Sequence, residues 1–421
     1  MKNITITLLF FCMFQMGAQE FTVDADLRQR FEYRHGFNTL FPDNAKPAAF
    51  VRQRARLNFN YSAEKLKLFI AVQDVSTWGD TRQILPADGN DSFMLFQAWA
   101  ELQLGTHWST KLGRQVISYD DQRIFGGLDW AMQGRFHDAA LLKYKKERTQ
   151  LDMGFAFNQQ GESILGTTYN IPGFFTYKSM QFVYFKQSWE QSSFSLLGLN
   201  TGFQRFAQED MTQADGVYYT QTVGSYFTFP IAKLKLSGSA YYQFGEAYPV
   251  DESLSAYQLA LNATYKVGST LLGVGAELLS GSDKGSSDRR SFFPLYGTNH
   301  KFNGFMDYFY VGNHANNVGL NDFHAKAVFK TGERATLLTA LHYFTSNGSI
   351  AETTDKYLGT ELDLVYTQPL IKNVKLQIGY SHMFASSNMS LIKNGVTSEN
   401  TNNWGWAMLV INPRLFNHNF D

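Results

Sequence analysis

Apolar and polar side chains alternate along residues 21–34. All but one of the odd positions are apolar, and the even positions are polar and mostly charged. Successive side chains of a β-strand point to opposite faces of the sheet. One face of this segment is therefore apolar, and the other carries more charge than the wet face of an ordinary strand needs. The pattern predicts a strand of an outer-membrane barrel, with lipid on one face and water on the other.

The same alternation recurs down the chain, beginning with residues 50–61, and we count about 18 such segments after residue 19. Short turns alternate with longer connections rich in Gly, Asn and Asp, which a soluble β-propeller gives no reason to expect. We predict an all-β, antiparallel, up-and-down transmembrane barrel of about 18 strands with short periplasmic turns and long extracellular loops. Turns are expected near residues 62–64, 106–108, 146–148, 190–192, 230, 267–269, 331–333 and 369. Loops are expected near residues 35–49, 79–91, 118–137, 159–174, 205–215, 245–253, 281–319, 346–355 and 385–401.

The N-terminus has the features of an export signal. Lys2 precedes an apolar run at residues 4–16, and small residues follow that run. We predict a signal peptide at residues 1–19 and a single barrel domain at residues 20–421, located in the bacterial outer membrane. The only cysteine, Cys12, lies in the predicted signal, so the mature chain has no thiol or disulfide.

Charge and motifs argue against several function classes. The 37 basic and 37 acidic residues cancel, so no global field attracts nucleic acid. Hydrolase, metalloprotease and phosphate-binding motifs are missing, and no apolar strand face combines the serine and histidine that a lipid hydrolase at the membrane boundary needs. His300, His314 and His324 come closest to a metal cluster. We predict no catalytic activity, cofactor or metal site.

Arginines gather on the polar face of the first two predicted strands. If the apolar faces contact lipid, these side chains line the lumen; they are Arg28, Arg30, Arg52, Arg54 and Arg56. Guanidinium groups stay protonated and match carboxylates and phosphates, so such a wall could pass an acidic solute between weak sites. The alternative is that Asp24, Asp26 and Glu32 pair with the arginines and brace a wide barrel.

Two long loops carry further candidate residues. Residues 113–138 combine glycines, one tryptophan, arginines and aspartates, which favours an ordered loop folded into the pore over an external loop packed on itself. Residues 293–309 are too aromatic for a disordered loop; they could stack on sugars or form a plug. The candidate pore-lining residues in these loops are Arg114, Asp120, Arg123, Arg135, Asp138 and Lys301.

The same two loops resemble the alginate export family of outer-membrane proteins. The first motif is Gly113-Arg114-Gln115 with Tyr119-Asp120-Asp121-Gln122-Arg123, Trp130, Arg135 and Asp138, and the second is Asn299-His300-Lys301 with Gly304-Phe305-Met306-Asp307. The resemblance implies an 18-stranded barrel and an arginine-rich conduit for an anionic polysaccharide, with loops that control access.

We therefore predict a channel for passive, selective passage of anionic saccharides. Its expected partners are outer-membrane lipid, acidic solutes and unidentified periplasmic export or uptake proteins, and no nucleic acid. The alternatives are a general diffusion porin, in which the charges only brace the wall, and an adhesive or structural barrel that binds through its long aromatic loop.

Overall fold

The structure, a computed structural model, describes residues 19–83, 92–169, 171, 176–207, 213–247, 252–309, 318–350, 354–393 and 395–420. Residues 1–18 of the predicted signal peptide lie outside this part, so the signal stays a prediction. The strands are β1 (Gln19–His35), β2 (Ala48–Ser62), β3 (Leu66–Thr77), β4 (Met94–Gln103), β5 (Trp108–Gln115), β6 (His137–Lys146), β7 (Thr149–Phe157), β8 (Ser179–Ser188), β9 (Ser193–Phe206), β10 (Ala214–Ile231), β11 (Leu234–Ala247), β12 (Glu252–Val267), β13 (Thr270–Leu279), β14 (Leu320–Lys330), β15 (Thr336–Thr345), β16 (Tyr357–Ile371), β17 (Val374–Ala385), β18 (Asn402–Ile411) and β19 (Arg414–Phe420).

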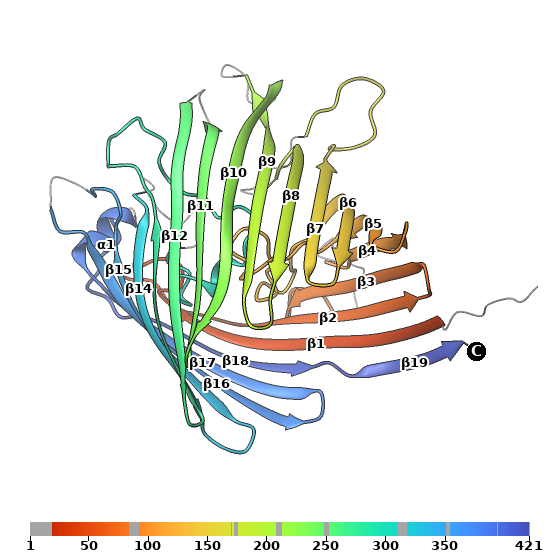
Figure 1. Ribbon diagram of the computed structural model, residues 1–421. Coiled ribbons are helices and arrows are strands. Elements are labelled where there is room, and N and C mark those ends of the chain that lie inside the picture. Colours follow the sequence, from red (N-terminus) through yellow and green to blue (C-terminus); the bar gives the residue numbers. More distant parts are fainter. Residues whose placement is uncertain are drawn as a thin grey trace, which may run out of the picture.

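The strands form one closed antiparallel barrel (Figure 1). Consecutive strands pair from β1 to β18, and β1 closes the sheet by pairing with β2 on one side and with β18 and β19 on the other. Because β18 and β19 pair with successive stretches of β1, they form one interrupted strand. The barrel therefore has 18 strand positions, which confirms the predicted fold class.

Inward and outward faces alternate as the sequence predicts. On β1, Phe31 is 44% exposed, whereas its neighbours Arg30 and Glu32 are 3% and 0% exposed. Exposed leucines, valines and aromatics recur on the outer face around the barrel. A band of this kind is what lipid contact requires.

The connections also follow the predicted alternation. The short turns, the chain's first described residue and the end of β19 lie at one end of the barrel, and the longer connections lie at the other. The predicted loop at residues 245–253 is shorter than expected, because residues 245–247 and 252–253 belong to β11 and β12. Two turn positions were wrong: Pro230 and Pro369 lie inside β10 and β16, near the end of each strand, and the turns follow at residues 232–233 and 372–373. Proline is tolerated at such a position because the ladder of hydrogen bonds ends there or is irregular, as it is beside Pro369.

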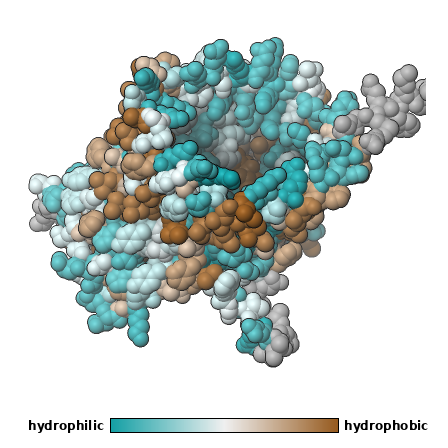
Figure 2. All heavy atoms as spheres, turned by 90° about the horizontal axis from the view of Figure 1, so that it is seen from below, coloured by the Kyte–Doolittle hydropathy of each residue, from teal (hydrophilic) through white to brown (hydrophobic). Residues whose placement is uncertain are grey.

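The buried apolar core lies inside the barrel. It consists largely of loop residues such as Phe125, Tyr296 and Tyr308, packed against inward side chains of the strands such as Phe182 and Trp404. The regular helices are short, η1 (Asn299–Lys301) and α1 (Ser387–Ile392). Among the described residues, no helix is both long and apolar enough to cross a membrane. Seen from below, the molecule is hollowed near its centre, and hydrophilic residues surround much of the opening (Figure 2).

The strand register can be tested with adjacent cysteines on β14. Ala325 pairs with the outward Val274 and Leu341, whereas Lys326 is on the opposite, inward face. In lipid vesicles, a water-soluble thiol reagent should label the Lys326→Cys variant quickly and the Ala325→Cys variant slowly. Faster labelling of the Ala325→Cys variant would contradict this register, because a slip of one residue exchanges the two faces.

Candidate functional site

The loop between β5 and β6 folds into the lumen; we call residues 116–136 the first inner loop. On one side, Asp129 pairs with Arg28 of β1 (2.7 Å) and Arg54 of β2 (3.0 Å). On the other side, Asp120 accepts hydrogen bonds from Tyr184 of β8 (2.8 Å) and Ser195 of β9 (2.6 Å). The loop thus crosses the barrel from wall to wall, and the alternative of an external loop is wrong.

The five arginines of β1 and β2 lie on the lumen face, and four of them brace the interior. Arg54 is fully buried between Asp129 and Asp26, the latter at 2.5 Å. Arg30 pairs with Glu32 at 2.8 Å, and its guanidinium lies over Trp130 of the first inner loop at 4.0 Å.

Arg56 and Arg52 differ in their partners. Arg56 donates two hydrogen bonds to Gln73 Oε1 (2.8 and 2.6 Å) and lies over the Phe96 ring. Arg52 faces Arg30 across the β1–β2 pair and forms no ion pair within the described residues; its buried Nε has no hydrogen-bond partner there. Among the five arginines of β1 and β2, Arg52 therefore has the most hydrogen-bonding capacity left to bind a solute.

The loop between β13 and β14 also enters the lumen; we call residues 280–309 the second inner loop. Tyr296 forms a parallel β-bridge with Phe125 of the first inner loop, and His300 stacks on Trp130 with the ring planes 9° apart. The hydroxyl oxygen of Tyr308 lies within hydrogen-bond distance of two carbonyl oxygens, Gly36 O (2.5 Å) and Thr39 O (3.0 Å), which share its one proton. Most aromatic rings of the second inner loop pack against other parts of the protein, as they would in a plug.

Three predicted site residues join the two inner loops. Arg123 is 2% exposed; its Nε lies 2.7 Å from Glu277 Oε1 of β13, and its Nη2 donates to Asn303 Oδ1 at 3.0 Å. Arg135 donates to Gly297 O at 3.1 Å, and Lys301 donates to Asp121 O at 2.7 Å. The two loops are therefore held together as one body inside the barrel.

Arg114 and Asp138 do not line the lumen, so this part of the prediction is wrong. They pair with each other across β5 and β6, with Nε and Oδ1 2.9 Å apart. Each lies two or four residues from an exposed leucine on its strand, Leu112 and Leu142, and therefore shares the outer face. The alternation of apolar and polar residues in this strand is too short to show from the sequence which face is apolar.

Burial and charge act against each other in the inner loops. Burial tends to raise the pKa of Asp129, but the charges of Arg28 and Arg54 lower it below its ordinary value. Burial raises the pKa of Asp121 and lowers that of Lys301, although the charge of each group partly offsets the shift of the other. Asp129 therefore stays ionised, and its ion pairs hold the first inner loop against β1 and β2.

A set of lysines that sequence reasoning missed faces the periplasmic mouth. They lie on the inner face, at the strand ends beside the short turns, and form no ion pair within the described part of the chain. We call them the mouth lysines: Lys67, Lys145, Lys235, Lys266, Lys330 and Lys375. The sequence pattern could have revealed most of them, since four of the six lie between two apolar outward residues, as Lys235 lies between Leu234 and Leu236.

An aromatic pair lies above these lysines on the lumen wall. Phe69 of β3 and Trp99 of β4 stack with ring centroids 5.4 Å apart. Lys111 of β5 holds its ammonium 3.8 Å from the centroid of the Trp99 ring. Both rings are on the inward face and only partly buried, so flat apolar surface and positive charge lie side by side in the lumen.

Comparisons agree with this architecture. Residues 19–160 match a family model described as alginate export, which confirms the resemblance at the first motif; the second motif lies beyond the matched residues. A comparison with curated protein sequences finds no match.

Solved structures share the barrel over nearly the whole chain. OpdQ of Pseudomonas aeruginosa is 14% identical and has a TM-score of 0.58, covering 94% of this chain and 98% of that one. OccAB1 of Acinetobacter baumannii is 15% identical (TM-score 0.61; 94% and 97% covered). A BenF-like porin from Pseudomonas fluorescens Pf-5 is 14% identical (TM-score 0.59; 94% and 99% covered). The chain has the fold of outer-membrane porins, and together with the family match this supports an outer-membrane channel.

The buried Arg123–Glu277 pair should decide whether the inner loops stay in place. The Glu277→Gln substitution leaves a buried guanidinium without its counter-charge, at a cost of about 3–5 kcal/mol. We expect larger and noisier single-channel conductance in planar bilayers as the loops loosen. The control is Glu252→Gln, which breaks a partly exposed pair with Arg289. Unchanged conductance in both variants would show that the buried pair does not hold the loops.

Lys393, which follows α1, should make the packing of the loops depend on pH. Its buried Nζ donates to Tyr308 O and to Asn38 O, and burial lowers its pKa to about 7. The pKa of an unfolded lysine is about 10.4. Burial of the neutral Lys393 side chain therefore contributes fully to stability above that pH, and the contribution is lost as the pH falls through 7. Hydrogen exchange at residues 305–309, corrected for intrinsic rates, should therefore be faster at pH 6 than at pH 9.

The Lys393→Met variant should lose this pH dependence, and Lys372→Met, in an exposed turn, should keep it. A dependence that persists in the Lys393→Met variant would assign the effect to another group.

Proposed function

We propose that this outer-membrane channel passes acidic saccharides passively and selectively. The mouth lysines carry the proposal, because six inward cations on six strands lack an ion-pair partner within the described residues. A channel of this kind needs no catalytic group and no cofactor.

Unpaired lysines at a wide mouth attract anions without trapping them. A ring of like charges between low-dielectric walls raises the local concentration of counter-charged solute. The ammonium groups lie near water on flexible stems, so each contact with an anion is weak and short-lived, as conduction requires. Among the predicted pore-lining arginines, Arg52 extends this path, and Arg54, Arg56 and Arg123 act mainly as braces.

The aromatic pair favours a saccharide over a simple inorganic anion. A sugar ring presents an apolar face that can stack on the flat surface of Phe69 and Trp99, and a uronic-acid carboxylate can then reach Lys111 or Lys67. This combination of stacking and charge recognises an acidic sugar better than a neutral sugar or chloride.

A general diffusion porin is the second candidate. It is favoured by the pairing of Arg28, Arg30 and Arg54 with carboxylates, since paired charges brace a wall without selecting a solute. The two candidates differ in what the mouth lysines do.

Replacing Lys235, Lys266 and Lys375 together by Gln tests that role. The triple variant should lose several-fold in anion-over-cation permeability, measured as a shift of the reversal potential towards zero in a salt gradient. The control removes three lysines from long loops, Lys46, Lys284 and Lys356, and should shift the potential little.

Acidic and neutral oligosaccharides of equal length separate the two candidates. Selective channels should be blocked reversibly by the acidic chain at much lower concentration than by the neutral chain, and the triple lysine variant should lose the difference. Equal block by both, or an unchanged reversal potential in the triple variant, would favour the general porin.

A further inference from the structure

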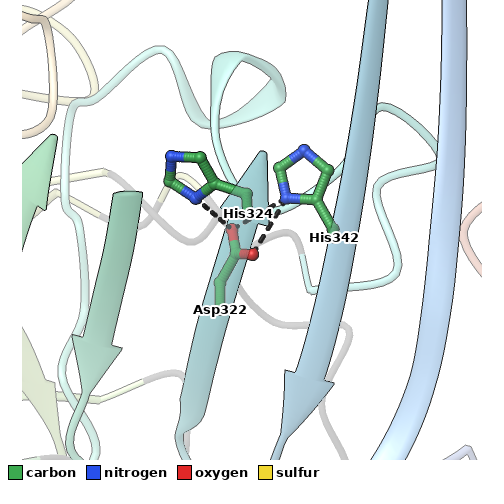
Figure 3. A group of neighbouring side chains, drawn as sticks. All are labelled: Asp322, His324 and His342. Atoms are coloured by element: carbon green, nitrogen blue, oxygen red, sulfur yellow. Dashed lines mark hydrogen bonds and ion pairs between the residues drawn. The ribbon is translucent and has the colours of Figure 1, made fainter. Parts of the chain in front are cut away.

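Three metal-ligating side chains meet on the lumen wall of β14 and β15. Asp322 and His324 come from β14, and His342 comes from the facing position on β15 (Figure 3). One ligand atom of each lies within 4.8 Å of the others, and the three side chains are only 2–11% exposed. His300, which the sequence analysis grouped with His324, stacks on Trp130 instead, and His314 lies outside the described residues.

The hydrogen bonds of His324 turn a lone pair towards Asp322. Its Nε2 lies 2.9 Å from Asn262 Oδ1, an acceptor, so the ring proton belongs on Nε2. Nδ1 then carries a lone pair; it is buried without a hydrogen-bond partner and lies 3.7 Å from Asp322 Oδ2. Two acceptors that face each other repel unless a proton or a metal ion lies between them. Gly275 makes room for this arrangement, because a Cβ there would lie 2.5 Å from His324 Nε2.

His342 faces the same carboxylate but, unlike His324, is within hydrogen-bond distance of it. Its Nδ1 lies 2.9 and 3.1 Å from the two Asp322 oxygens, and its Nε2 lies 3.8 Å from Asp363 Oδ2 of β16, which has no hydrogen-bond partner within the described residues. Each imidazole therefore has the Asp322 carboxylate beside Nδ1, and the Nε2 of His324 also has an outer acceptor within hydrogen-bond distance, Asn262 Oδ1. Outer acceptors of this kind orient the histidine ligands of metal sites.

Further ionisable groups lie on the same wall as the three side chains. Asp363 and Glu361 of β16 add buried carboxylates, while Lys326, two residues from His324 on the same face, adds one positive charge. Glu277 is already paired with Arg123. Buried carboxylates are stable when they are paired or bound to metal.

We propose that Asp322, His324 and His342 bind one divalent transition-metal ion such as Zn²⁺ through the carboxylate and both Nδ1 atoms. Two imidazoles and one carboxylate suit Zn²⁺, and Mg²⁺ or Ca²⁺ prefers all-oxygen sites. A water molecule can supply the fourth ligand. The ion joins β14 to β15 and adds positive charge to the channel wall. This proposal does not depend on the proposed solute.

Zinc binding to the full-length protein, purified in detergent without a metal-affinity tag, tests the proposal. We expect one Zn²⁺ per chain by titration calorimetry, and Co²⁺ should give the visible absorption of a tetrahedral site with nitrogen and oxygen ligands. The variants His324→Gln and His342→Gln should each weaken binding beyond the roughly 10- to 100-fold that loss of an outer partner costs. Asn262→Ala, which removes only the outer acceptor of His324, should fall within that range.

The control is His418→Gln, at an exposed position on β19, which should bind Zn²⁺ like the parent chain. Heat-modified mobility on gels confirms that each variant forms a barrel. The proposal is overturned if the parent chain binds no Zn²⁺, or if folded His324→Gln and His342→Gln variants bind it as tightly as the parent.

Discussion

Ion pairs between the wall and the first inner loop are the interaction on which the interior depends. A barrel of this width leaves its inward polar groups facing water unless something inside pairs with them. Asp129 meets Arg28 and Arg54 on one wall, and Arg123 meets Glu277 on another. Because these anchors lie far apart around the barrel, the loop between them is stretched across the lumen. The second inner loop then packs on the first through Tyr296 and His300, and the core of the protein forms inside the barrel.

This arrangement separates the charges of the lumen into two groups. At the level of the inner loops, most of the arginines are paired with carboxylates, so they contribute rigidity and little net field. At the periplasmic mouth, the lysines have no such partners within the described residues and keep their charge beside water. The neutral total of 37 basic and 37 acidic residues therefore conceals a local excess of positive charge, and selectivity arises from where charges stay unpaired.

The sequence predicts the parts of this structure that depend on local periodicity. Lipid outside and water inside impose a period of two on every strand, so the strand number, the faces of β1 and β2 and the alternation of short and long connections follow from the pattern. Partners across the lumen do not follow, because they depend on register between distant strands. Asp322 and His324 could be assigned to the inward face, but their meeting with His342 depends on the register of a hairpin. Arg114 was misassigned because its strand is short, and the lysines were overlooked although their alternation was visible.

The most direct test of a basic periplasmic mouth is the sidedness of block by an acidic oligosaccharide in a single oriented channel. The rate of blocking events should be higher when the saccharide is added on the periplasmic side, and the difference should shrink as salt screens the lysines. A neutral oligosaccharide of the same length should show no such salt-dependent difference. Equal rates from the two sides at low salt, or a faster rate from the extracellular side, would contradict the assignment of the positive charge to that mouth.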